Sequence, residues 1–96
     1  MPAYLIVLRE SPTRDADAYA EYLRANHAAT PPVRPTPLAA YGTIEGLEGV
    51  APDGAVVLKF DSVEDAHKWY DSPDYQAALP HRLRSADWRA FIIQGL

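Results

Sequence analysis

The sequence predicts a mixed α+β fold whose elements follow the order strand, helix, strand, strand, helix, strand. Two observations support this class. Apolar runs of strand length alternate with segments whose apolar residues recur at helical spacing, and Ser-Pro and Pro-Asp-Gly breaks separate them. The 96 residues suit one domain spanning 1–96, and a chain of this size buries roughly 60 to 65% of its unfolded surface.

The N-terminal third predicts a strand and then a helix. The apolar run from Tyr4 to Leu8 is a strand, and Ser11-Pro12 breaks it. A helix is expected to start between Thr13 and Asp15, because residues 19, 22, 23 and 26 then share one face. Four prolines between residues 31 and 37 cannot continue a helix, so this stretch is expected to be an extended connection.

The middle of the chain predicts two paired strands. The second strand is expected from Leu38 to Ile44, with Gly42 as a bulge or a point of close backbone approach. A Pro-Asp-Gly turn signal at residues 52–54 then leads into a third strand from Ala55 to Phe60.

The last third predicts two helices and a final strand. Ser62 and Ser72 each suit an N-cap, and Pro73 suits a first helical position. The helix after Ser62 is expected to turn Val63, Ala66, His67 and Tyr70 inward, and the next one Tyr75, Ala78, Leu79 and Arg82. A kink or restart is expected at Pro80, and residues 88–94 form the last strand. This order is the ferredoxin-like split β-α-β pattern.

The strands also predict a homodimer. Residues 4–8, 56–58 and 90–93 are apolar at successive positions, so both faces of the sheet are apolar. Helices of this topology cover one face, and 96 residues leave nothing for the other. Two subunits stacked sheet on sheet, as a dimeric α/β barrel, would cover it; a monomer with a short exposed apolar run is the alternative.

The composition of the chain disfavours two classes of partner, nucleic acids and membranes. The net charge is -4, with no cluster of Lys or Arg, which disfavours nucleic acid. No segment approaches the roughly 20 apolar residues that span a bilayer, so no membrane partner is expected and the cytosol is the expected location. The chain has no cysteine, no phosphate loop, no metal-binding histidine spacing and no serine-hydrolase elbow. No metal or cofactor is therefore predicted.

The segment Trp69-Tyr70-Asp71-Ser72-Pro73-Asp74-Tyr75-Gln76 resembles a stretch typical of the DUF1330 family, a domain of unknown function. The similarity extends from Tyr4 to Gly95 and is most specific from Trp69 to Ala78. It implies the dimeric α/β barrel. The chain departs from the family pattern at residues 31–37, where members carry a Lys/Arg-Tyr-Gly-Gly-like stretch, and at residues 80, 81 and 84.

Candidate site residues are few. His27 and His81 are candidate catalytic acid/base groups, although His27 also suits a helix C-terminus and His81 an exposed surface. His67 is expected to be partly buried and hydrogen-bonded. Arg82 lies in an apolar stripe, where it must extend its charged end to solvent, pair with a carboxylate such as Asp71 or Asp87, or meet an anion.

A pocket between the helices and the sheet is expected to hold a small, partly apolar, anionic molecule. Its expected binding residues are Tyr22, Asn26, Tyr41, Trp69 and Arg82. Three hypotheses remain open: a cofactor-independent isomerase, cyclase or lyase that works by proton transfer, a non-catalytic ligand-binding or regulatory dimer, and a purely structural dimer module.

Overall fold

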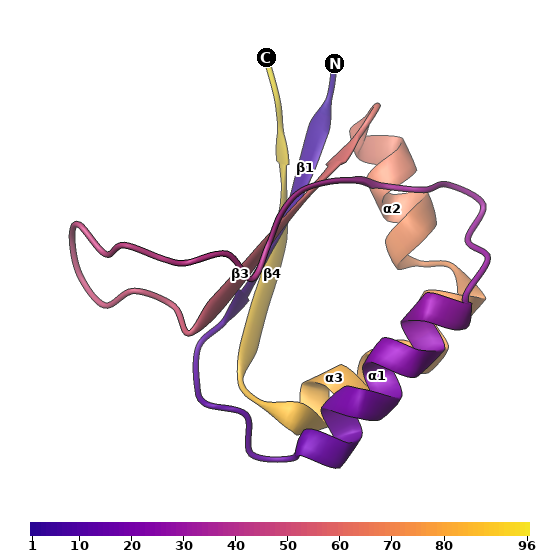
Figure 1. Cartoon of the computed structure of the whole chain (residues 1–96). Coiled ribbons are helices and arrows are strands. Elements are labelled where there is room, and N and C mark those ends of the chain that lie inside the picture. The colour runs from indigo at the N-terminus through magenta and orange to yellow at the C-terminus, as the bar shows by residue number, and fades with distance from the viewer.

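The computed structural model describes all residues from Met1 to Leu96. In chain order the elements are β1 (Ala3–Arg9), α1 (Ala16–Ala28), β2 (Thr36–Ala40), β3 (Gly54–Phe60), α2 (Val63–Tyr70), α3 (Pro73–Ser85) and β4 (Trp88–Gln94). The strands form one antiparallel sheet in the spatial order β2-β3-β1-β4 (Figure 1). The α+β class and the ferredoxin-like topology are thereby confirmed.

Side-chain caps fix where each helix begins. The Asp15 carboxylate accepts the Ala18 amide at 2.9 Å, and the Ser62 hydroxyl accepts the Asp65 amide at 3.0 Å. Ser72 accepts the Tyr75 amide at 3.3 Å. Each such cap contributes about 1 kcal/mol to helix stability. The junction predicted at Ser72 and Pro73 is confirmed.

The prediction for the second strand was wrong in position. β2 runs from Thr36 to Ala40, so it begins inside the proline-rich stretch, and it ends before Tyr41, whose φ is 56°. Proline is tolerated there because β2 is an edge strand. The register shift lies between Pro37 and Ala39, and a Cβ added to Gly42 would meet nothing within 4 Å. Gly42 is therefore neither a bulge nor a close approach.

Two details of the later helices also differ from expectation. Helix α3 continues through Pro80 without a restart, because the buried side chains of Leu79 and Arg82 hold it against the core across the missing hydrogen bond. On α2 the buried residues are Ala66 and Trp69, and the predicted Tyr70 packs against the core beside them, while His67 is exposed. The expected partly buried His67 was therefore wrong.

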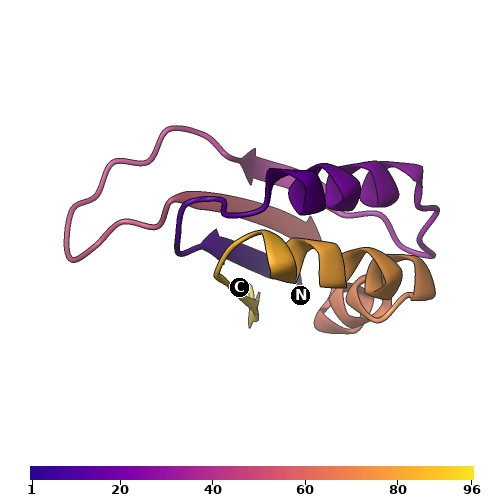
Figure 2. The same ribbon diagram turned by 90° about the horizontal axis from the view of Figure 1, so that it is seen from below.

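The sheet has one covered face and one open face. All three helices lie on one side of it (Figures 1 and 2). The core between sheet and helices includes Leu5, Val7 and Phe60. The opposite face has no cover within the chain, and Phe91 and Ile93 of β4 are 46% and 53% exposed there. None of the helices is both long and apolar enough to cross a membrane.

Candidate functional site

A cavity of about 280 Å³ lies between the helices and the covered face of the sheet. Residues of all three helices and of strands β1 to β3 line it, together with the proline-rich connection between α1 and β2. Small-molecule sites span about 300 to 1,000 Å³, so this volume suits a compact ligand. The lining is mainly apolar, with a few polar groups.

Aromatic rings form much of the wall. Trp69 and Tyr75 pack with ring centroids 4.2 Å apart, and Tyr22 meets Tyr75 edge to face at 6.2 Å. The hydroxyls of Tyr22 and Tyr75 lie 3.2 Å apart and share a hydrogen bond. One of the two hydroxyls donates to the other, so the second keeps a proton that can be donated elsewhere.

Arg82 of α3 contributes a buried positive charge to the cavity wall. Arg82 is 3% exposed, and its Nε and Nη1 atoms have no hydrogen-bond partner. The guanidinium carbon lies 5.1 Å from the centre of the Trp88 ring, which is a cation–π arrangement. The ring offers no hydrogen-bond acceptor in the guanidinium plane, so the N–H donors remain free for a ligand.

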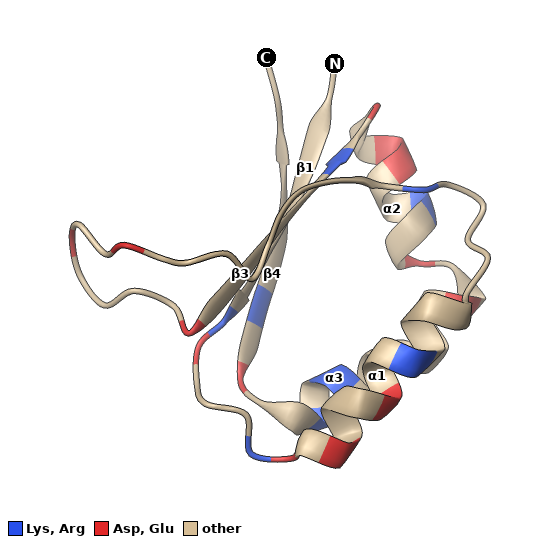
Figure 3. Cartoon of the chain, viewed as in Figure 1, with Lys and Arg blue, Asp and Glu red and all other residues tan.

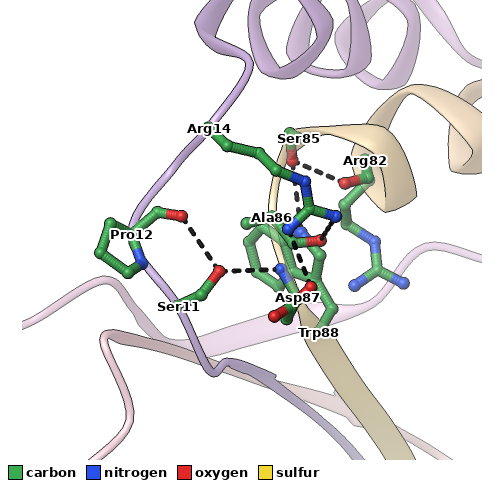
Figure 4. Close-up of polar contacts among 8 residues, drawn as sticks. All are labelled: Ser11, Pro12, Arg14, Arg82, Ser85, Ala86, Asp87 and Trp88. Carbon is green, nitrogen blue, oxygen red and sulfur yellow. Dashed lines mark hydrogen bonds and ion pairs between the residues drawn. The ribbon is translucent and has the colours of Figure 1, made fainter.

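The junction between α3 and β4 holds Trp88 in place (Figure 4). The indole Nε1 of Trp88 donates to the Ser85 hydroxyl at 3.2 Å, and that hydroxyl donates to the Arg82 carbonyl at 2.6 Å. Arg14 donates to the Asp87 carboxylate at 2.8 Å and to the Ala86 carbonyl at 3.2 Å. The ring beside Arg82 is therefore fixed by a hydrogen-bonded frame.

The predicted ion pair of Arg82 was wrong. Asp87 pairs with Arg14, and no salt bridge joins Arg82 to Asp71 or to any other carboxylate. In Figure 4 the guanidinium of Arg82 points away from the surrounding contacts. Asp87 lies beyond the turn into β4, where its carboxylate is exposed and Arg14 from the loop before α1 bonds it.

Two hydroxyls of the cavity lining have raised pKa values. Desolvation, followed by the neighbouring Tyr75, raises the pKa of Tyr22 well above its usual value. Desolvation and the neighbouring Tyr19 likewise raise the pKa of Tyr41, even though Arg82 opposes the shift. Both phenols are therefore neutral at physiological pH and act as hydrogen-bond donors, not as bases.

A second cation stands at the more exposed part of the lining. Arg34 lies in the proline-rich connection, is exposed and makes no salt bridge. Pro31, Pro35 and Pro37 line the same wall. The lining contains no Asp, Glu, His or Lys. The cavity is thus positive in a chain of net charge -4, and it attracts anions.

The cavity gathers some of the predicted site residues and leaves out others. The expected binding residues all lie in its lining: Tyr22, Asn26, Tyr41, Trp69 and Arg82. His27 and His81 do not line it. His27 is exposed in the last turn of α1, and the Nδ1 atom of His81 lies 2.7 Å from Nη2 of Arg84. No group of three or more acidic, His or Cys residues is placed to hold a metal ion.

Sequence reasoning missed several lining residues. Arg34 was overlooked because the proline-rich connection was taken only as a departure from the family pattern. A single cation among prolines was the signal that could have identified it. Tyr75 was assigned to the core, and its hydroxyl faces Tyr22. The proline wall could not be foreseen, since the path of a connection depends on where β2 joins the sheet.

The fold and the cavity define a ferredoxin-like α+β protein with a small, positively charged, largely apolar pocket. The chain belongs to the DUF1330 family, described as a domain of unknown function, because the family model matches residues 2–96. No curated protein matches the chain.

Solved structures with similar folds include a dimeric ferredoxin-like protein of unknown function from Thermobifida fusca YX. It is 26% identical with a TM-score of 0.63, over 97% of this chain and 90% of that one. A dimeric protein of unknown function with a ferredoxin-like fold, from Bacteroides fragilis, is 16% identical with a TM-score of 0.61, over 98% and 96%. An ethyl tert-butyl ether d (EthD) family protein from Bacillus halodurans is 16% identical with a TM-score of 0.64, over the full length of both chains.

Proposed function

We propose that this protein is a cytosolic homodimer that binds a small, partly apolar organic anion in the cavity beside Arg82. The anionic group meets the guanidinium and the hydroxyls of Tyr22 and Tyr75, and the apolar part lies against the aromatic and proline walls. Arg34 attracts the anion toward the opening.

The observation that carries this proposal is the unpaired state of Arg82. A buried charge costs several kcal/mol unless it is paired and hydrogen-bonded. Arg82 is only 3% exposed, and its Nε and Nη1 atoms lack hydrogen-bond partners. No carboxylate of the chain pairs with it. An anion entering the cavity would supply the missing acceptors, and charge-assisted hydrogen bonds are the strongest of their kind.

The lining favours binding over proton-transfer catalysis. A general base must reach the proton that it removes, and near neutral pH its pKa must suit that task. His27 and His81 are outside the lining, and the cavity phenols keep their protons. We therefore expect His27→Ala and His81→Ala to leave ligand affinity unchanged, which a titration of each variant would test.

A thermal-shift panel tests the binding proposal. Benzoate, phenylacetate and butyrate should each raise the melting temperature in a saturable way, whereas benzamide, which has the shape of benzoate without its charge, should not. At ten times Kd the stabilisation is about 1.4 kcal/mol, which corresponds to several degrees for a domain of this size. Equal effects of benzoate and benzamide, or no effect of any carboxylate, would refute an anion site.

The homodimer rests on the open face of the sheet. Tyr4, Ile6 and Leu8 alternate with core residues along β1, and β4 adds Phe91 and Ile93 beside them. Two structures with the same fold are described as dimeric. Apolar area of this kind is worth about 25 cal/mol per Å² when buried.

Sedimentation equilibrium at micromolar concentration should give twice the chain mass of 10.6 kDa. Phe91→Asp should give monomers, because a charge would enter the apolar interface. Leu83→Asp, at an exposed leucine on the helical side, should remain dimeric. A monomeric wild type, or a dimeric Phe91→Asp variant, would refute this interface.

A further inference from the structure

The connection between β2 and β3 forms a long arm, defined here as residues 42–52. It contains no helix or strand and projects from the sheet on the side opposite to the helices (Figures 1 and 2). Most connections between elements of a compact domain have about 4 to 6 residues, so this one is long. The arm has no packing partner within its own chain near its tip, where Leu47 is 94% and Val50 is 100% exposed.

We infer that the arm packs on the second subunit of the homodimer, with Leu47 and Val50 buried in the contact. This inference rests on the homodimer proposed above, because the arm projects on the side that the second subunit would cover. An exposed leucine and valine close together on one projecting segment are costly for a monomer, and a neighbouring subunit removes that cost.

The root of the arm is fixed to the sheet, so its direction is set by the fold. The Tyr41 amide donates to the Ala55 carbonyl at 2.9 Å, and the Asp53 amide donates to the Arg9 carbonyl at 2.7 Å. Arg9 returns a hydrogen bond from Nη2 to the Asp53 carbonyl at 3.0 Å. An added Cβ at Gly54 would come within 3.2 Å of the Tyr41 ring, so a larger residue would have to displace that ring.

Charge complementarity favours a second copy as the partner. The arm carries Glu45 and Glu48 and no basic residue (Figure 3). On the open face the strand register puts Lys59 level with Tyr4. Lys59 makes no salt bridge, whereas Arg89 pairs with Glu10 of its own chain. The acidic arm of one subunit can therefore approach the partner's Lys59, and the exchange is reciprocal in a two-fold dimer.

Site-specific crosslinking tests the contact directly. The chain has no cysteine, so Leu47→Cys gives one attachment point for a benzophenone maleimide. Dimers formed from ¹⁵N-labelled and unlabelled chains are irradiated, and mass spectrometry identifies mixed-isotope crosslinks. Crosslinks from the arm to the other subunit support the inference. Crosslinks confined to one chain, in a protein that sediments as a dimer, overturn it.

The energetic test uses Leu47→Asp and Val50→Asp, measured by sedimentation. Each should raise the dimer dissociation constant by about 10-fold or more, since it puts a charge into a buried apolar contact. Leu83→Asp, which adds the same charge to an exposed leucine on α3, is the control and should leave the constant unchanged. Unchanged dimerisation of both arm variants refutes the arm contact and spares the dimer, whereas a monomeric wild type refutes both.

Discussion

Two arginines lie near the C-terminal end of α3, and the more exposed of them makes the more hydrogen bonds. Arg14 has a side chain that is 54% exposed, yet it bonds both a carboxylate and a backbone carbonyl. Arg82 is 3% exposed, yet its Nε and Nη1 atoms bond nothing (Figure 4). Water could solvate Arg14 even without a protein partner. Arg82 has lost its water on burial, and no hydrogen-bond acceptor of the protein replaces that water at Nε and Nη1.

Arg14 carries a structural charge, whereas we propose that the charge of Arg82 is held ready for a ligand. Arg14 ties the loop before α1 to the start of β4, and a surface pair of this kind contributes about 0 to 1 kcal/mol. By the proposal above, Arg82 should lower the stability of the empty protein, and a bound anion should recover that cost. The two residues should therefore respond in opposite ways to the same substitution.

The largest expected effect is on ligand affinity. Arg82→Met keeps an unbranched side chain but removes the charge, and it should weaken benzoate binding by about 100-fold, the loss typical of a charge-assisted hydrogen-bonded contact. Arg82→Lys should give an intermediate loss, because one ammonium replaces a planar fork. Isothermal titration measures both. Equal affinity in Arg82→Met and wild type would end the assignment of Arg82 as the anion receptor.

The next effect is on the empty protein. Without ligand, Arg82→Met should raise the free energy of unfolding by about 1 to 3 kcal/mol, since it removes an uncompensated buried charge. Urea denaturation in a buffer free of small carboxylates measures this change. A variant less stable than wild type would mean that Arg82 supports the core chiefly through its packing on Trp88.

Tyr22 should make stability depend on pH in alkaline solution. Its pKa is raised in the folded state from 10.0, so the folded protein holds this proton more tightly than the unfolded chain does. The stabilisation is complete below pH 10 and is lost as the pH rises further, with a slope of about 1.4 kcal/mol per pH unit.

Denaturation at several pH values above 10 would reveal this slope, and Tyr22→Phe should reduce it. Tyr70→Phe is the matched control, because Tyr70 does not line the cavity and is only half-buried. Equal slopes in wild type and Tyr22→Phe would show that the buried phenol does not set the alkaline limit.

The smallest expected effect belongs to Arg14. Arg14→Met should lower the free energy of unfolding by about 0 to 1 kcal/mol and leave benzoate affinity unchanged, since the pair with Asp87 is solvent-exposed. Thermal denaturation and titration of the same preparation give both values. A loss of affinity as large as that of Arg82→Met would remove the distinction between the two arginines.

Local signals predicted most of the fold. The Ser72-Pro73 junction was visible because a cap and a first-turn proline act within a few residues, and the buried stripe of α3 followed from helical spacing. β2 was misplaced because two prolines argued against a strand before residue 38, and only the edge position of β2 tolerates them. Pro80 was misjudged for a similar reason, since burial of its neighbours outweighs its local cost.

The candidate site divides in the same way. Spacing brought Arg82 into an apolar stripe, which raised the choice between a carboxylate and an anionic ligand. Only the three-dimensional arrangement excluded the carboxylate, because Asp87 pairs with Arg14 and no other carboxylate pairs with Arg82. The anionic ligand stays a proposal. His27 and His81 were plausible as residue types, but whether a side chain reaches a cavity depends on helix orientation, which no local pattern records.

By itself, the sequence determined the order of the elements, their caps, the two apolar faces of the sheet and the presence of a cation among core residues, since each depends on neighbours within about one or two turns of chain. The tertiary structure decided which carboxylate found which arginine, where the proline-rich connection closed the cavity and which way the arm projected. These depend on contacts between residues far apart in the chain, and a contact of that kind is fixed only when the whole sheet and its helices pack together.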